Sequence, residues 1–279
     1  MKISRSSFLQ LLASGAVAPA IAYVPFRKID TLSIEPALND ALGMASYTLR
    51  KFTIDEVISV VNKLGIKHLA LKSMHMPLDS SDADIQSIAT KVRNAGIDLY
   101  GAGVIYMKTA DEVRNAFRYA KAASIGTIIG VPNHELLPLS NELVQQYDIK
   151  LAIHNHGPGD ELYPSPQSIM DRIKDLDDRV GVCLDIGHAV RIGLDVATET
   201  KRCAGRLYDV HLKDVNVAAA EGGSVEMGRG ILDIPTFLKT LKSIDYQGVL
   251  GLEYEKDADD PMLGLAESVG FARGVMRMI

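Results

Sequence analysis

Short apolar runs alternate with amphipathic stretches along most of the chain. The apolar runs are rich in β-branched side chains, and the stretches between them place apolar residues on one helical face, as Val57, Val61 and Leu64 do. This alternation predicts strands at 41–46, 68–71, 99–104, 127–131, 151–154, 181–185, 207–211 and 249–253. Helix-capping residues predict helices that begin near Thr53, Asp82, Thr109, Pro138, Ser165, Asp195, Asp233 and Asp259.

The repeat of strand and helix predicts a single (β/α)8 TIM barrel over residues 23–279. No linker rich in glycine, proline or serine divides the repeat, and its length suits one barrel. An open, doubly wound sheet would use the same alternation and is the alternative fold. The absence of a glycine-rich dinucleotide fingerprint after the first strand disfavours that alternative.

Residues 1–22 have the pattern of an export signal. Lys2 and Arg5 give a positive end, residues 8–17 are mostly apolar, and Ala20 and Ala22 offer the small side chains that a signal peptidase reads. We therefore expect cleavage after Ala22 and a periplasmic protein. The apolar run is too short for a stable membrane anchor, and an uncleaved tail is the alternative.

Composition narrows the classes of partner. The chain has 30 basic and 35 acidic residues among 279, so it offers no excess of positive charge for nucleic acid. The two cysteines, Cys183 and Cys203, cannot form a disulfide framework, and we expect both to be buried as small apolar side chains. Composition leaves the oligomeric state undecided, so a homo-oligomer is one of the partners considered.

Four side chains that can bind a metal end consecutive strands: His154, Asp185, His211 and Glu253. Neighbouring barrel strands lie about 4.8 Å apart, so side chains at one rim can converge on one ion. Asp185 also sits in an apolar strand, where a buried charge needs a partner. Two imidazoles and two carboxylates predict one divalent ion, of Mn, Co, Zn or Fe.

Other polar residues follow the strands and are candidates for contacts with substrate. Lys72 and His75 follow the second strand, and Lys213 follows His211. Each can polarise a substrate oxygen, and Lys213 is in addition a candidate acid or base. Exposed lysines in loops are more often simply solvated.

Four ordered motifs resemble those of the xylose-isomerase-like sugar phosphate isomerase/epimerase superfamily. They are Leu184-Asp185-Ile186-Gly187-His188, Val210-His211-Leu212-Lys213-Asp214, Gly228-Arg229-Gly230-Ile231-Leu232-Asp233 and Gly251-Leu252-Glu253-Tyr254-Glu255. The resemblance implies a divalent-metal barrel, with relatives among sugar isomerases, ketose 3-epimerases, inosose dehydratases and endonuclease IV. It also implies that Asp185, His211 and Glu253 are ligands, and that His188 and Arg229 grip substrate oxygens.

The chain departs from this family pattern at the fifth strand. Ketose epimerases typically carry glutamate there, facing the glutamate of the last strand across the reacting carbon, whereas this chain has His154. Epimerisation needs a second acid or base on the other face. We expect His156 to supply it, because imidazole titrates near neutral pH. The alternative for His156 is packing or capping in its loop.

The expected chemistry is removal of a proton beside the carbonyl of a sugar or keto-sugar, a small-molecule substrate. Glu253 is the expected base, and a metal would stabilise the enediolate. Isomerisation or epimerisation is the first prediction. An exported keto-sugar (3-keto-glycoside) lyase, dehydratase or hydratase would use the same step, and a non-catalytic sugar-binding barrel is a further alternative.

Overall fold

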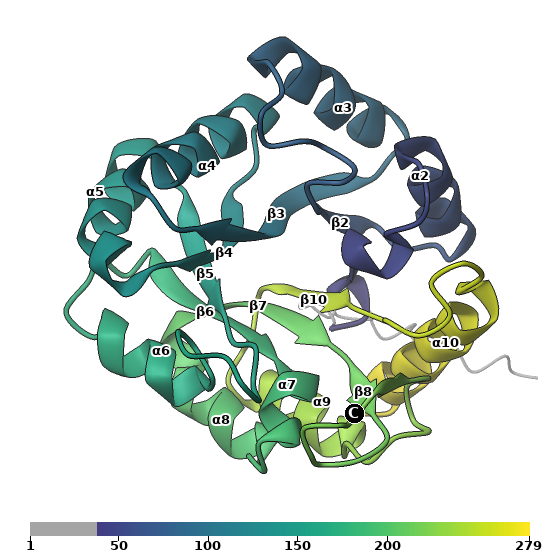
Figure 1. Cartoon of the computed structure of the whole chain (residues 1–279). Coiled ribbons are helices and arrows are strands. Elements are labelled where there is room, and N and C mark those ends of the chain that lie inside the picture. Colours follow the sequence, from purple (N-terminus) through teal and green to yellow (C-terminus); the bar gives the residue numbers. More distant parts are fainter. Residues whose placement is uncertain (1–37) are drawn as a thin grey trace, which may run out of the picture. The chain divides into compact units, whose positions relative to one another are not determined.

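The computed structural model describes residues 38–279, so the expected export signal at residues 1–22 lies outside the described residues. Within the described part, eight parallel strands close into a barrel in the order β1-β10-β7-β6-β5-β4-β3-β2. Helices form a ring around these strands (Figure 1). The predicted (β/α)8 barrel is therefore confirmed.

The barrel strands lie within or near the predicted ranges. They are β1 Leu42–Ala45, β2 His68–Leu71, β3 Asp98–Met107, β4 Thr127–Pro132, β5 Lys150–His154, β6 Val180–Asp185, β7 Leu207–Leu212 and β10 Val249–Leu252. The helices are α2 Ile54–Lys63, α3 Asp82–Asn94, α4 Ala110–Ala123, α5 Leu137–Tyr147, α6 Pro166–Ile173, α7 Ile186–Arg191, α8 Val196–Cys203, α9 Ile234–Ser243 and α10 Met262–Met278.

Side-chain caps explain why most helices begin where the sequence predicts. Thr53, Thr109 and Ser165 each form a capping box, in which the cap side chain and the third helical residue satisfy each other's backbone N–H groups. Asp195 and Asp233 accept one backbone N–H each at the starts of α8 and α9. The last helix, α10, begins at Met262, later than the expected start near Asp259.

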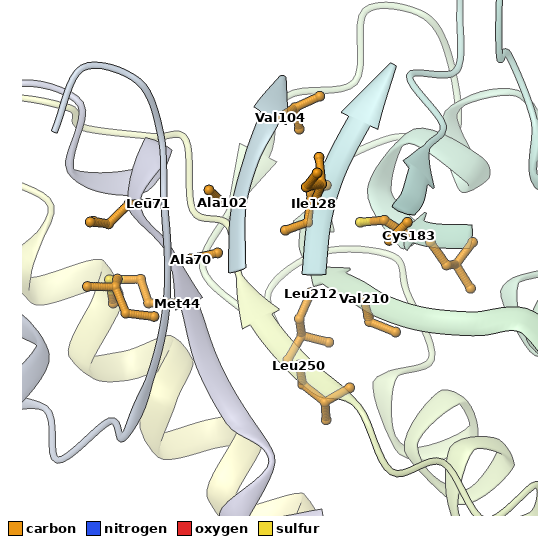
Figure 2. Close-up of a cluster of buried hydrophobic side chains, with 14 of the residues drawn as sticks. Met44, Ala70, Leu71, Ala102, Val104, Ile128, Cys183, Val210, Leu212 and Leu250 are labelled. Carbon is orange, nitrogen blue, oxygen red and sulfur yellow. The ribbon is translucent and has the colours of Figure 1, made fainter. Parts of the chain in front are cut away.

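The core consists of aliphatic side chains carried by the strands. Figure 2 shows part of it, with Met44, Leu71, Ile128, Val210 and Leu250 drawn among the strands. Each of these five side chains has at most 1% of its surface exposed. Filling the barrel with apolar side chains supplies most of its stability and leaves polar groups to the strand ends.

The segment between β7 and α9 contains a small hairpin that the sequence did not predict. Its strands, β8 (Asp214–Val215) and β9 (Ser224–Val225), pair antiparallel outside the barrel. The buried Asp214 carboxylate accepts hydrogen bonds from the backbone N–H groups of Val215, Gly228, Gly230 and Leu232. A Cβ at Gly230 would lie 2.0 Å from Asp214 Oδ1, so only glycine allows this approach.

No helix in residues 38–279 is both long enough and apolar enough to cross a membrane.

Candidate functional site

The four side chains predicted to share a metal come together at one end of the barrel. His154 ends β5 and Asp185 ends β6, while His211 lies near the end of β7 and Glu253 directly follows β10. One nitrogen or oxygen atom of each lies within 4.8 Å of one such atom of the other three. All four side chains are buried. Convergence follows from the fold, because the carboxyl ends of parallel barrel strands share one rim.

The distances identify the atoms that face the centre of this cluster. Nε2 of His154 lies 3.0 Å from Nδ1 of His211 and 3.5 Å from Oδ2 of Asp185. Nδ1 of His211 lies 3.2 Å from Oε2 of Glu253. Two ring nitrogens and two carboxylate oxygens therefore point at one another, which is the arrangement of a ligand set.

Asp185 serves two structural elements at once. Its Oδ1 accepts the backbone N–H of His188 at 2.8 Å and so caps the short helix α7. Its Oδ2 is buried and faces the cluster, 3.1 Å from the Lys213 ammonium and 3.5 Å from Nε2 of His154. The sequence did not predict α7. Asp185, one of the four candidate ligands, is also the residue that caps this helix.

Lys213 enters the cluster from β7 and lies among its carboxylates. The ammonium group is 2.9 Å from Oε2 of Glu253 and 3.1 Å from Oδ2 of Asp185, and it also donates to Glu255. A Cβ at Gly187 would come within 2.8 Å of the Lys213 side chain, so this glycine leaves the space the lysine occupies. Lys213 is therefore a buried partner of the carboxylates, with 4% of its surface exposed.

Attraction between opposite charges keeps the buried carboxylates of Glu253 and Asp185 and the imidazole of His211 in their charged forms. Burial opposes ionisation of Glu253, but His211 and Lys213 outweigh it and hold the pKa of Glu253 well below its ordinary value. Asp185 behaves similarly, because His188 and Lys213 hold its pKa well below the ordinary value. For His211, burial is outweighed by the charge of Glu253, which raises the pKa to about 9.

This donor set fits a divalent metal ion. Two imidazole nitrogens and two carboxylate oxygens lie within 4.8 Å of one another, on four buried side chains. Ligand sets of this kind suit Mn, Co, Zn or Fe better than Ca²⁺, which prefers oxygen alone. His154, Asp185, His211 and Glu253 would hold the ion.

A cavity of about 290 Å³ opens above the cluster. Its lining includes the ligand candidates His154 and Glu253 and the predicted substrate-contact residues Lys72 and His188. Lys72 donates to the carbonyl of Val104 at 2.7 Å, and burial lowers its pKa. The ammonium group is thus held at the cavity wall by a neutral acceptor.

His156 also lines the cavity, next to Tyr106. Nε2 of His156 is 2.8 Å from the Tyr106 hydroxyl, and Nδ1 is 3.5 Å from a carboxylate oxygen of Asp160. Burial lowers the pKa of His156 to about 4, so the ring is neutral near pH 7 and, contrary to the expectation from the sequence, does not titrate near neutrality. A neutral imidazole with a proton on Nδ1 accepts the hydrogen bond of the tyrosine.

The structure places two predicted substrate-contact residues away from the cavity. His75 is buried against the segment that follows β1, where it contacts the Ser46 hydroxyl and the carbonyls of Leu49 and Phe52. Arg229 is largely exposed and forms a two-bond ion pair with Glu267 of α10. In this arrangement the two residues stabilise loops and are not among the residues that line the cavity.

Sequence reasoning did not single out three residues of this region. Tyr47 and Tyr106 line the cavity on either side of Lys72, whose ammonium lies 5.7 and 5.9 Å from their ring centres. Glu255 also lines it and receives a hydrogen bond from Lys213. Position was the available signal, because Tyr47 follows β1, Tyr106 ends β3 and Glu255 lies two residues after Glu253.

A family model described as xylose isomerase-like TIM barrel matches residues 40–275 of the chain. Among curated relatives, an inosose dehydratase from Clostridium perfringens is 28% identical over 132 residues, which cover 41% of this chain and 43% of the relative. The matches to the curated relatives span about two fifths of their length.

Solved structures share the fold. An L-ribulose 3-epimerase aligns with a TM-score of 0.69 at 13% identity, covering 85% of this chain and 95% of that one. The apo 3-keto-D-glucoside 4-epimerase of E. coli aligns with a TM-score of 0.68 at 14% identity, covering 84% and 99%. At these identities the likeness concerns the fold.

Proposed function

The chain belongs to the xylose isomerase-like TIM barrel family, and from its site we propose a divalent-metal-dependent sugar isomerase or epimerase. The observation that carries this proposal is the position of Glu253. Its side chain belongs to the four-residue ligand cluster and also lines the cavity above it. A carboxylate in that position can remove a proton from a substrate bound in the cavity.

A bound divalent ion would supply positive charge that stabilises an enediolate and acidifies the C–H bond beside the substrate carbonyl. Glu253 is ionised near neutral pH, because its pKa lies well below the ordinary value. It is therefore ready to accept a proton, although a carboxylate of low pKa is a weak base. Lys213, at 2.9 Å from Oε2, holds the carboxylate in place and balances its charge.

His156 and Tyr106 are the groups for a second proton transfer. Glu253 reaches the cavity from β10, whereas Tyr106 comes from β3 and His156 from the loop after β5. The barrel order separates β3 from β10 by β1 and β2, so the groups approach from different sides of the rim. Reprotonation of the same carbon from that second side would complete an epimerisation, whereas reprotonation of the neighbouring carbon would complete an isomerisation.

The substrate we propose is a small sugar or keto-sugar. A cavity of about 290 Å³ has room for one sugar ring, and Tyr47 and Tyr106 offer aromatic surface to it. Lys72 and His188 provide hydrogen-bond donors for hydroxyl or carbonyl oxygens. Nucleic acid is not the proposed partner, because the net charge is −5.

Elimination from a keto-sugar is the second candidate, as in a dehydratase, lyase or hydratase. Its specific support is His154, which stands where ketose epimerases typically carry glutamate. Without that second carboxylate, loss of a β-substituent after proton removal needs only an acid to assist the leaving group. The sequence match to an inosose dehydratase supports the same alternative.

Solvent exchange tests the proposed base. The metal-loaded protein is incubated in D₂O with a panel of ketoses and 3-keto-glycosides, and NMR follows deuterium entry beside the carbonyl. Glu253→Gln keeps one oxygen ligand and the shape, so it should lose exchange by about two orders of magnitude or more while still binding metal. Exchange at the wild-type rate in Glu253→Gln would place the base elsewhere.

His156→Asn separates the reaction classes in the same assay. If His156 handles the second transfer, the variant exchanges deuterium normally but forms product slowly. The product identifies isomerisation, epimerisation or elimination directly. If the wild-type protein exchanges none of the panel but binds its members, a non-catalytic sugar-binding barrel replaces the enzyme.

A further inference from the structure

The imidazole of His211 faces a different group on each of its two edges. Nδ1 points into the ligand cluster, 3.0 Å from Nε2 of His154 and 3.2 Å from Oε2 of Glu253. Nε2 points down into the barrel, 3.7 Å from Oδ2 of Asp209. Nε2 is buried and makes no hydrogen bond within residues 38–279, and the Asp209 carboxylate is the charged group that faces it.

Asp209 lies two residues before His211 on β7, so the two side chains lie on the same face of the strand. Its carboxylate has no exposed surface. Oδ1 accepts the Tyr100 hydroxyl at 3.1 Å, and Oδ2 accepts the Cys183 thiol at 3.4 Å. Donors from two other strands thus hold both oxygens, and Oδ2 stays directed toward His211.

A neutral imidazole carries one proton, so a histidine that binds metal through Nδ1 must keep that proton on Nε2. A carboxylate beside Nε2 favours this tautomer and orients the ring. Such partners are common behind metal-binding histidines, and their removal weakens metal binding. Nothing in the proposed proton transfers uses Asp209, Tyr100 or Cys183.

We propose that Asp209 is a positioning residue for the metal centre: its carboxylate lies beside Nε2 of His211 and favours the tautomer that leaves Nδ1 free to bind the ion. This inference rests on the proposed metal-dependent function. Tyr100 and Cys183 act one step further away, by fixing the orientation of the Asp209 carboxylate.

Cys183 has a competing role to consider, because its sulfur lies within 4.8 Å of a ring nitrogen of both His154 and His211 and could share an ion with them. The geometry favours support over ligation. The thiol donates to Asp209 Oδ2, so the sulfur proton is engaged below the cluster. Asp185 ends the same strand two residues later and brings Oδ2 into the cluster instead.

Metal affinity in Asp209→Asn tests the proposal. The variant is nearly isosteric and removes the buried charge, so the metal-free protein should melt within about 3 °C of wild type. Titration calorimetry with MnCl₂ and with ZnCl₂ should show binding about 10- to 100-fold weaker. Asp209→Ala provides a second measurement at the same position. Tyr100→Phe is the matched control. It removes the buried hydroxyl that donates to Asp209 but leaves the Asp209 carboxylate beside His211.

The outcomes are distinct. A selective loss of metal affinity, with the metal-free stability kept and a smaller effect in Tyr100→Phe, supports the proposal. Wild-type affinity in Asp209→Asn overturns it, as does a loss of affinity that only follows a parallel loss of metal-free stability. If wild-type protein binds neither ion, the proposed metal-dependent function fails and this inference fails with it.

Discussion

The ammonium group of Lys213 lies 2.9 Å from Oε2 of Glu253, the same carboxylate oxygen that is 3.2 Å from Nδ1 of His211. The lysine therefore neutralises an oxygen that is also a candidate metal ligand. Because Asp185 Oδ2 is 3.1 Å from the same ammonium, one buried cation serves both carboxylates. A divalent ion bound there would share these oxygens with Lys213.

Asp185→Ala and Asp185→Asn should separate the two functions of that side chain. Both variants remove the anionic ligand and should be poor in metal, as measured by elemental mass spectrometry. Asp185→Ala also removes the cap of α7, which adds about 1 kcal/mol of destabilisation, whereas Asn can still accept the N–H of His188. Urea unfolding of metal-free protein should rank Asn above Ala. Unchanged metal content in both variants would eliminate the shared site.

Lys213→Met should destabilise the metal-free protein by about 3–5 kcal/mol, because it leaves buried carboxylates without their cation. Added Mn²⁺ should raise the melting temperature of the variant more than that of wild type, since the ion neutralises the same oxygens. Lys67→Met is the matched control, because Lys67 pairs with Asp40 on the exposed surface and its loss should change little. An equal metal response in wild type and Lys213→Met would contradict the shared neutralisation.

Glu226 should make stability depend on acid pH. Hydrogen bonds from Lys256 and, to a lesser degree, Tyr254 lower its pKa from 4.5 to about 2. A lowered folded-state pKa stabilises the protein above the ordinary value, and this contribution is lost as pH falls from 4.5 toward 2. Glu226→Gln should therefore be less stable than wild type at neutral pH.

The difference between Glu226→Gln and wild type should shrink on acidification. Urea unfolding of both proteins near neutral pH and at about pH 3 measures it. A difference in unfolding free energy that stays constant between these conditions would show that the Glu226 charge has no part in the stabilisation.

Export should leave a mature chain that begins at Tyr23. The positive end, apolar run and small residues of positions 1–22 predict cleavage after Ala22. Mass spectrometry of the protein from the envelope fraction of its native cells measures the first residue. A chain that starts at Met1 in the cytosol would contradict export.

The alternation of apolar runs and amphipathic stretches predicted the barrel well, because each strand is marked by its own short apolar run. The apolar run 68–71 coincides with β2 at both ends, and capping residues marked the start of most helices. The convergence of His154, Asp185, His211 and Glu253 followed as a geometric consequence, since the topology alone brings the carboxyl ends of parallel strands together.

Residues beyond the strand ends were less predictable, because the direction of a loop side chain depends on the path of its loop. Arg229 turns outward to Glu267, and His75 turns toward the segment that follows β1. Asp209 was missed for a different reason. It lies inside a strand, and its meaning depends on Tyr100 and Cys183, which come from strands remote in sequence.

The Asp214 carboxylate ties the segment after β7 into one cooperative unit. Four backbone N–H groups share its two oxygens, so releasing one end of the loop weakens the attachment of the others. Asp214 is also the residue directly after Lys213, and any opening that displaces its carboxylate strains the backbone that carries the buried ammonium. The backbone amides of Gly228, Gly230 and Leu232 should therefore exchange with solvent together, and metal binding next to Lys213 should slow all three.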